Sequence, residues 1–144
     1  MIKRATIDDV DVLAEFAVQI YTGANVTELT EEFSESIRNE NSAFFIKFDD
    51  EKPIGFAEAG LRFDYVEGTD SSPVGYLEGI YVLPEYRRKG FACALVYECE
   101  KWAKSKNCTE FASDCELNNI NSLNFHKKIG FTEANRIICF VKNL

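Results

Sequence analysis

An apolar segment, a basic turn and an amphipathic segment follow one another in the middle of the chain, and this order constrains the fold more than any other feature. Residues 75–83 are largely apolar and are followed by Pro84, which predicts a buried strand. Residues 90–106 carry apolar side chains at helical spacing on one face and charged side chains elsewhere. The chain therefore passes from a strand, through the basic turn 87–89, into the clearest helix of the sequence.

The other predicted elements lie on both sides of this unit. Before it, the sequence predicts a short strand at 2–4, a helix after the capping box Thr6–Asp9, a helix starting near Thr30, and a hairpin of strands 44–48 and 54–63. After it, the sequence predicts a strand at 111–113, a helix at 120–128 that stops at Gly130, and a last strand at 137–141. This order predicts one α/β (α+β) domain over residues 1–144, with helices packed around a mixed sheet.

Cysteine usage and hydropathy limit the compartment. The five cysteines are odd in number and form no Cys-x-x-Cys pair, which argues against a disulfide framework and against a zinc site. We expect no metal, a reducing compartment, and cysteines that mostly serve as small apolar residues in or near the core. The N-terminus has no secretory signal, and no apolar stretch approaches the roughly 18–20 residues of a membrane helix. The sequence therefore predicts a cytoplasmic protein that does not enter the membrane.

The acidic charge balance limits the class of partner. The formal net charge is −8, and the sequence pI is near 4.7. Nucleic acid, a polyanion, is not expected to bind such a chain, whereas a polycationic small molecule is attracted to it. The alternative interpretation is that most of the 24 acidic residues simply keep the surface soluble.

The basic turn before the clearest helix has the features of an anion site. Backbone N–H groups at a helix start have no intrahelical acceptor, and the helix dipole favours an anion there. Gly90 lets the backbone approach a phosphate closely, and Arg87, Arg88 and Lys89 add positive charge. The Walker and Rossmann patterns are both absent. The turn therefore indicates a pyrophosphate site built mainly from main chain, with an ordinary exposed basic turn as the alternative.

The pattern Arg87-x-x-Gly90-x-Ala92 after a strand resembles the acetyl-CoA signature of the GNAT acetyltransferases. The resemblance implies the GNAT fold, in which helices cover both faces of a mixed, mostly antiparallel sheet. It also implies acetyl-CoA as the co-substrate, with the edge of the strand at Ile80, Tyr81 and Val82 pairing with the pantetheine amides. The residues that surround the pyrophosphate would be Arg88, Lys89, Gly90, Phe91, Ala92 and Cys93.

A second part of the family pattern follows downstream. Asn119-x-x-Ser122-x-x-x-His126-x-x-x-Gly130-Phe131 resembles the family's series of an Asn, a small residue, a Tyr and Gly-Phe. The resemblance implies that Asn119 contacts the cofactor. It places His126 at the usual tyrosine position, where the side chain returns a proton to the departing CoA thiolate. A structural role for this single histidine is the alternative.

A narrower resemblance points to the aminoglycoside 6'-N-acetyltransferases. It rests on Asp64-Tyr65-Val66-x-Gly68-Thr69, on residues 71–74, on residues 77–84, on residues 110–114 and on Gly130-Phe131-x-Glu133. It implies that Glu78 and Asp114 hold the drug's ammonium groups and help to remove a proton, so that the amine attacks the thioester directly in a ternary complex. Tyr65 would contact the drug. Tyr21 stands where relatives commonly have Trp, and Asn135 stands where some have an acid, which leaves the drug range open.

Each of these assignments has a structural alternative. Glu78 is otherwise a partly exposed strand residue, Asp114 a turn or helix cap, and Tyr65 a packing residue. Two other functions also fit the sequence: a GNAT enzyme acting on another small amine, such as a polyamine, and a non-catalytic domain that binds acetyl-CoA. Because the related enzymes are often dimers, the resemblance also implies a homodimer.

Overall fold

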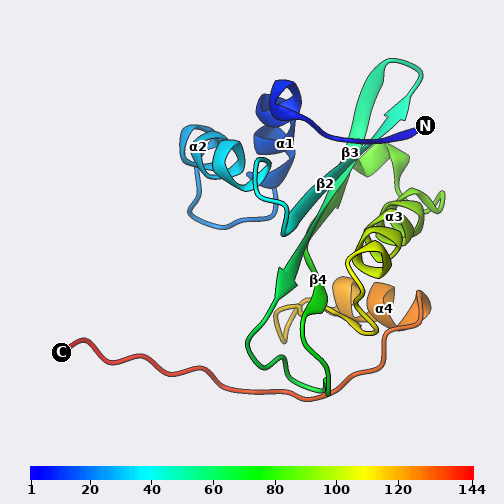
Figure 1. Cartoon of the computed structure of the whole chain (residues 1–144). Coiled ribbons are helices and arrows are strands. Elements are labelled where there is room, and N and C mark those ends of the chain that lie inside the picture. The colour runs from blue at the N-terminus through cyan, green and yellow to red at the C-terminus, as the bar shows by residue number, and fades with distance from the viewer.

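A five-stranded sheet with the strand order β1-β2-β3-β4-β5 forms the centre of the computed structural model, which describes all residues 1–144 (Figure 1). The strands are β1 (Ile2–Arg4), β2 (Ser42–Asp49), β3 (Lys52–Arg62), β4 (Val74–Val82) and β5 (Phe111–Ala112). Neighbouring strands from β1 to β4 are antiparallel, and only β4 and β5 are parallel. The predicted mixed, mostly antiparallel sheet is thus confirmed.

Helices cover both faces of this sheet, as predicted (Figure 1). On one face lie α1 (Val10–Ala17) and α2 (Val26–Ser36), and on the other lie α3 (Phe91–Ser105) and α4 (Ile120–Lys128). Two short 3-10 helices, η1 (Ile7–Asp9) and η2 (Pro84–Tyr86), precede α1 and the basic turn. The predicted bounds of α3 and α4 agree with the structure to within one residue.

Strand β2 explains why the chain forms two cores. Successive side chains of a strand point to opposite faces of the sheet. Phe44 and Ile46 accordingly join the core beneath α1 and α2, whereas Ala43 and Phe45 join the core beneath α3. Trp102 of α3 lies in the second core, as expected. Both faces of β2 are therefore buried between two layers of helix.

Helix starts depend on capping side chains, and the sequence-based prediction placed the start of α2 incorrectly. The capping box at Thr6 is confirmed, because the Thr6 amide donates to Asp9 Oδ2 at 2.8 Å. The prediction that α2 starts near Thr30 was wrong. The helix begins four residues earlier, because the side-chain oxygen of Asn25 accepts from the Glu28 amide at 2.9 Å. Asn25 is thus a cap of α2 as well as the end of the preceding loop.

The strand predicted at 137–141 is absent from the structure. This C-terminal segment runs extended away from the sheet (Figure 1), and Ile138, Phe140 and Val141 are 80%, 91% and 94% exposed. A strand needs a neighbour for its backbone N–H and C=O groups. The prediction fails because no strand of the same chain lies beside the segment.

The cysteines also differ from the expectation. Only Cys99 and Cys108 are buried, whereas Cys93, Cys115 and Cys139 are exposed thiols. Burial raises the pKa of the Cys99 thiol, which makes that sulfur unreactive. The expectation that most of the cysteines lie in the core was therefore wrong.

None of the helices is both long and apolar enough to cross a membrane.

Candidate active site

The sheet opens between β4 and β5. These two strands pair only at Gly75 with Phe111 and at Tyr76 with Ala112, so the rest of β4 has no partner on that side. On its other side β4 pairs with β3 through an irregular step, where Glu58 faces Gly79 and Ala59 faces Leu77. Glu78 is the extra residue of this bulge. A bulge re-aims side chains and is frequent beside active sites.

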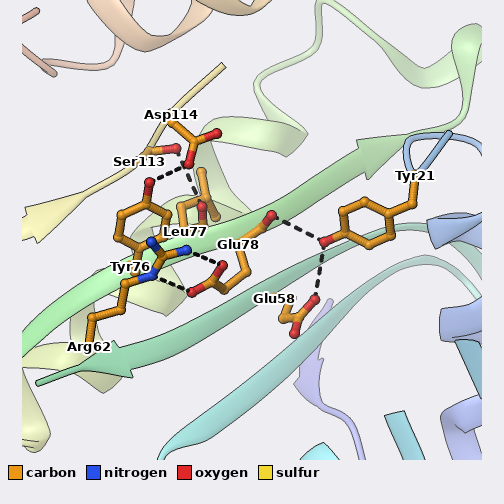
Figure 2. Close-up of polar contacts among 8 residues, drawn as sticks. All are labelled: Tyr21, Glu58, Arg62, Tyr76, Leu77, Glu78, Ser113 and Asp114. Carbon is orange, nitrogen blue, oxygen red and sulfur yellow. Dashed lines mark hydrogen bonds and ion pairs between the residues drawn. The ribbon is translucent and has the colours of Figure 1, made fainter. Parts of the chain in front are cut away.

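Glu78 is bound by a side chain of β3. The Nε–H of Arg62 donates to Glu78 Oε1 at 3.0 Å, and the Nη2–H donates to Oε2 at 2.9 Å (Figure 2). This is the two-point geometry that a guanidinium and a carboxylate favour. The pair raises the pKa of Arg62 above its usual range. The carboxylate of Glu78 is thus held in place by the cationic side chain of Arg62.

The other predicted acid is tied to the same group of side chains. Asp114 follows β5, and its Oδ2 accepts a short hydrogen bond from the Tyr76 hydroxyl. Burial and this bond raise the pKa of Tyr76. The Arg62 guanidinium carbon lies 3.4 Å from the centre of the Tyr76 ring. Glu78, Arg62, Tyr76 and Asp114 therefore form one continuous network at the point where the sheet opens (Figure 2).

Sequence reasoning found the two acids of this network but missed its other two members. Tyr76 stands two residues before Glu78, the spacing that puts side chains on one face of a strand. That spacing was an available signal. Arg62 had none, because it meets Glu78 only through the pairing of β3 with β4.

A second polar contact lies at the bulge. Tyr21 follows α1 in the chain. Its hydroxyl oxygen lies 3.3 Å from Glu58 Oε2 and 3.1 Å from the carbonyl oxygen of Glu78 (Figure 2). Burial and the neighbouring Glu78 raise the pKa of Glu58 to about 7. The structure thus places Tyr21 beside the predicted site, and it adds Glu58, which the sequence did not single out.

The basic turn has the geometry of an anion site. Gly90 adopts φ +82° and precedes α3, and a side chain built on it would meet no atom within 4 Å. The amides of Phe91, Ala92 and Cys93 have no backbone acceptor, as expected in the first turn of a helix. Space and unpaired donors therefore occur together at the residues predicted to hold a pyrophosphate.

The three basic residues of the turn have different environments. Arg87 folds back, and its Nε–H donates to the Val82 carbonyl at 2.8 Å. Arg88 and Lys89 are exposed, and the Lys89 ammonium lies 5.3 Å from the centre of the Tyr86 ring. Arg87 therefore closes the turn onto β4, whereas Arg88 and Lys89 present their charge to solvent.

His126 points toward β5 rather than into solvent. Its Nε2 lies 2.8 Å from Ser113 Oγ, and its Nδ1 lies 2.7 Å from the Ser122 carbonyl oxygen. Because a carbonyl only accepts, Nδ1 donates to the Ser122 carbonyl, and Nε2 is left to pair with the Ser113 hydroxyl. Asn119 caps α4, with its side-chain oxygen accepting from the Ser122 amide at 3.1 Å. Both residues thus make structural contacts within the chain, and their predicted roles toward the cofactor stay predictions.

Two predicted drug contacts lie outside the hydrogen-bonded network. Tyr65 is 77% exposed in the loop between β3 and β4. The Asn135 amide donates to Glu67 Oε1 at 2.9 Å, which ties the start of the C-terminal segment to the same loop. No group of three or more His, Cys, Asp or Glu side chains is arranged to hold a metal ion.

Comparisons with known proteins place the chain in a family. The model of the acetyltransferase (GNAT) family matches residues 10–131. An aminoglycoside N(6')-acetyltransferase type 1 from Acinetobacter haemolyticus is 48% identical over 99 residues, which are 69% of this chain and 68% of that protein. The enzyme of the same name from Stenotrophomonas maltophilia is 35% identical over 140 residues, which are 96% of this chain and 90% of that protein.

Solved structures agree with this placement. The structure of AAC(6')-Iy in complex with the bisubstrate analogue CoA-S-monomethyl-acetylneamine superposes with a TM-score of 0.95 at 35% identity, and the match covers 100% of this chain and 98% of that one. The structure of AAC(6')-IG from Acinetobacter haemolyticus superposes with a TM-score of 0.94 at 36% identity, covering 100% and 99% of the two chains. The chain therefore belongs to the acetyltransferase (GNAT) family and groups there with the type 1 aminoglycoside N(6')-acetyltransferases.

Proposed function

We propose that this protein transfers the acetyl group of acetyl-CoA to the 6'-amino group of aminoglycosides. The observation that carries the proposal is the position of Glu78 and Asp114, two fixed carboxyl groups where the sheet opens between β4 and β5. Carboxylates are the natural hosts of ammonium groups. The names of the similar enzymes support the same substrate and the same donor.

In this proposal the donor lies along β4 and the start of α3. The free amides of Phe91, Ala92 and Cys93, together with Arg88, Lys89 and Gly90, hold the pyrophosphate. The unpaired edge of β4 at Ile80, Tyr81 and Val82 accepts the pantetheine arm as an added strand would be accepted. Asn119 adds a contact from the start of α4.

The reaction then needs only oriented groups and proton transfer. Glu78 and Asp114 orient the ammonium group and help to remove its proton, directly or through water. The free amine attacks the thioester carbonyl, the carbon–sulfur bond breaks, and the CoA thiolate takes up a proton for which His126 is the proposed donor. The exposed Cys93 has no adjacent base, so no covalent acetyl-enzyme is proposed. Tyr21, Tyr65 and Asn135 contact the drug around this centre.

The wider role follows from the chemistry of the product. Acetylation turns an ammonium group of the antibiotic into a neutral amide, and we propose resistance as the consequence of this lost charge. A cytoplasmic location is also proposed, because three exposed cysteines suit a reducing compartment.

We further propose that two copies of the chain associate through residues 137–141. This segment exposes the apolar side chains of Ile137, Ile138, Phe140 and Val141. Its extended backbone forms no ladder within the chain. The edge strand of a second copy would pair its N–H and C=O groups and cover its apolar side chains.

A panel of amines with a thiol-detecting assay tests the activity. We expect acetyl-CoA and a 6'-amino aminoglycoside to release free thiol, and the 6'-hydroxyl analogue to release none. Thiol release with a polyamine but not with the drug would instead support a GNAT enzyme for another amine. Binding of acetyl-CoA without thiol release from any amine would support a non-catalytic acetyl-CoA-binding domain.

A further inference from the structure

Glu58 is a titratable group at the site that the reaction described above does not use. It lies on β3 opposite Gly79, directly beside the bulge that presents Glu78. Its carboxyl group lies 3.3 Å from the Tyr21 hydroxyl (Figure 2). The charged groups that act on it are both negative, Glu78 on β4 and Glu32 on α2. A partly buried carboxyl group without a cationic partner is costly to ionise, which calls for an explanation.

The contact between Tyr21 and Glu58 depends on a specific local packing. Gly79 has no side chain, and a Cβ placed there would collide with the Tyr21 hydroxyl and press on Ile20. The bulge therefore leaves a space that the phenol oxygen occupies. Burial also raises the pKa of Tyr21 above its usual range, so the hydroxyl keeps its proton.

The Tyr21 hydroxyl has one proton and two acceptors within reach. It lies 3.1 Å from the Glu78 carbonyl oxygen and 3.3 Å from Glu58 Oε2. When Glu58 is ionised, the hydroxyl donates to that carboxylate. When Glu58 is protonated, its own O–H donates to the Tyr21 oxygen, and the Tyr21 proton turns to the Glu78 carbonyl. The protonation state of Glu58 thus sets the direction of the Tyr21–Glu58 hydrogen bond, and it decides whether the Tyr21 proton is donated to the Glu78 carbonyl.

We propose that Glu58 is a positioning residue that acts through Tyr21 and accepts, by way of that hydroxyl, the proton that the substrate's ammonium group loses before attack. An N–H bond of the ammonium group breaks, and its proton passes to the Tyr21 oxygen, directly or through one water. The Tyr21 proton moves at the same time to Glu58 Oε2. Glu58 becomes neutral, Tyr21 is unchanged, and nitrogen keeps the electron pair with which it attacks the thioester.

The electrostatics of the pair suit this task. Burial and the negative charge of Glu78 raise the pKa of Glu58 to about 7, so the carboxylate is a far better proton acceptor than an exposed glutamate. Glu78 is less suited as the acceptor, because Arg62 binds both of its oxygens. In this arrangement Glu58, acting through Tyr21, takes the proton in place of Glu78 and Asp114, which then only orient the cation. The inference rests on the proposed function, since it needs an ammonium substrate at this site.

The kinetic test compares three variants over a range of pH. The wild-type kcat/KM is expected to rise with pH through a step near 7 that Glu58→Gln abolishes. At alkaline pH, Glu58→Gln and Tyr21→Phe should each lower kcat about a hundredfold, the size of a typical acid–base contribution, without changing KM for acetyl-CoA. Glu32→Gln is the matched control, since it removes a nearby negative charge that has no bond to Tyr21. It should retain kcat and shift the step to lower pH. An unchanged step and unchanged kcat in Glu58→Gln would overturn the proposal.

A direct titration keeps this inference separate from the proposed function. Carbon-13 NMR of the glutamate carboxyl groups, recorded without any substrate, should show one signal titrating near 7 that is missing from Glu58→Gln. Tyr21→Phe should move this midpoint upward, because the Tyr21 hydrogen bond lowers the pKa of Glu58. If every glutamate signal titrates below about pH 5.5, the assignment of Glu58 as the proton acceptor is wrong, even where the drug is acetylated. If no aminoglycoside is acetylated while the signal titrates near 7, the proposed function fails and the Tyr21–Glu58 pair stands.

Discussion

Arg62 binds Glu78 through two hydrogen bonds, of 3.0 and 2.9 Å, while its guanidinium group also lies on the ring of Tyr76. A carboxylate expected to receive the substrate's cation is therefore held by a cation of the protein. Because the fork of a guanidinium fixes both oxygens of its partner, the pair orients Glu78 rather than merely neutralising it.

Replacing Arg62 tests this orientation. Arg62→Met should lower kcat/KM for the drug by roughly ten- to a hundredfold, since a hydrogen bond to a charged group contributes about 1.5–3 kcal/mol. Arg62→Lys should restore only part of the loss, because an ammonium group lacks the fork. Lys52→Met, which removes an exposed cation paired with Glu85, is the control and should leave steady-state kinetics unchanged. A lower KM with an unchanged kcat in Arg62→Met would mean that Arg62 competes with the drug.

The second prediction concerns Glu78 and Asp114, the two carboxylates proposed to bind the substrate. Glu78→Gln and Asp114→Asn should each lower kcat/KM for a 6'-amino drug by roughly ten- to a few-hundredfold, because each removes a charged partner of the ammonium groups. Acetyl-CoA affinity, measured by calorimetry, should hardly change. Added salt should weaken drug binding by the wild type, since the partner is a polycation. Near-normal turnover by both variants would refute the assignment of these acids.

The turn before α3 makes a third prediction. Gly90→Asp should abolish measurable acetyl-CoA binding, because it sets a carboxylate against the pyrophosphate. Gly90→Asn is the matched control. Asn has the same shape without the charge and tolerates the positive φ of this position better than most residues. We expect Asn to bind acetyl-CoA more weakly than the wild type but far better than Asp. Equal affinities in the two variants would place the pyrophosphate elsewhere.

The raised pKa of Glu58 makes a prediction about stability. The group titrates near 4.5 in the unfolded chain and near 7 in the folded protein, so the folded state holds the extra proton between these values. The free energy of unfolding should therefore fall as pH rises through this window, by about 3 kcal/mol. Glu58→Gln should remove this fall in urea denaturation and be the more stable protein at alkaline pH. The lowered pKa of Asp9 acts at more acidic pH, so it does not obscure the difference. Parallel curves for the two proteins would contradict the prediction.

The exposed C-terminal segment makes a fifth prediction. Sedimentation should show a dimer for the wild type, and Phe140→Lys should shift it to a monomer, because a charge cannot be covered in an apolar contact. Lys142→Glu changes a charge in the same segment without removing an apolar side chain, and it should remain dimeric. A wild-type monomer at high concentration would rule out association through this segment.

The sequence by itself determined the unit from β4 through the basic turn to α3. A run of apolar residues, Pro84, the basic turn, Gly90 and an amphipathic face act over a few neighbouring residues, so their structure needs little help from the rest of the chain. For the same reason α4 was placed correctly. Glu78 and Asp114 could be placed on a strand and at a strand end from local pattern, whereas their chemistry was predicted from the family resemblance and stays a prediction.

Only the tertiary structure decided which side chains meet at the site. Arg62 reaches Glu78 across 16 residues of sequence, and Tyr21 reaches Glu58 across 37, through the pairing of strands and the packing of α1 on the sheet. The raised pKa of Glu58 comes from burial between such elements, which no local pattern encodes. The segment 137–141 shows the same limit, since its apolar residues favour a strand but a strand forms only beside a partner edge. Local sequence therefore specified the elements, and long-range packing specified the charges and contacts among them.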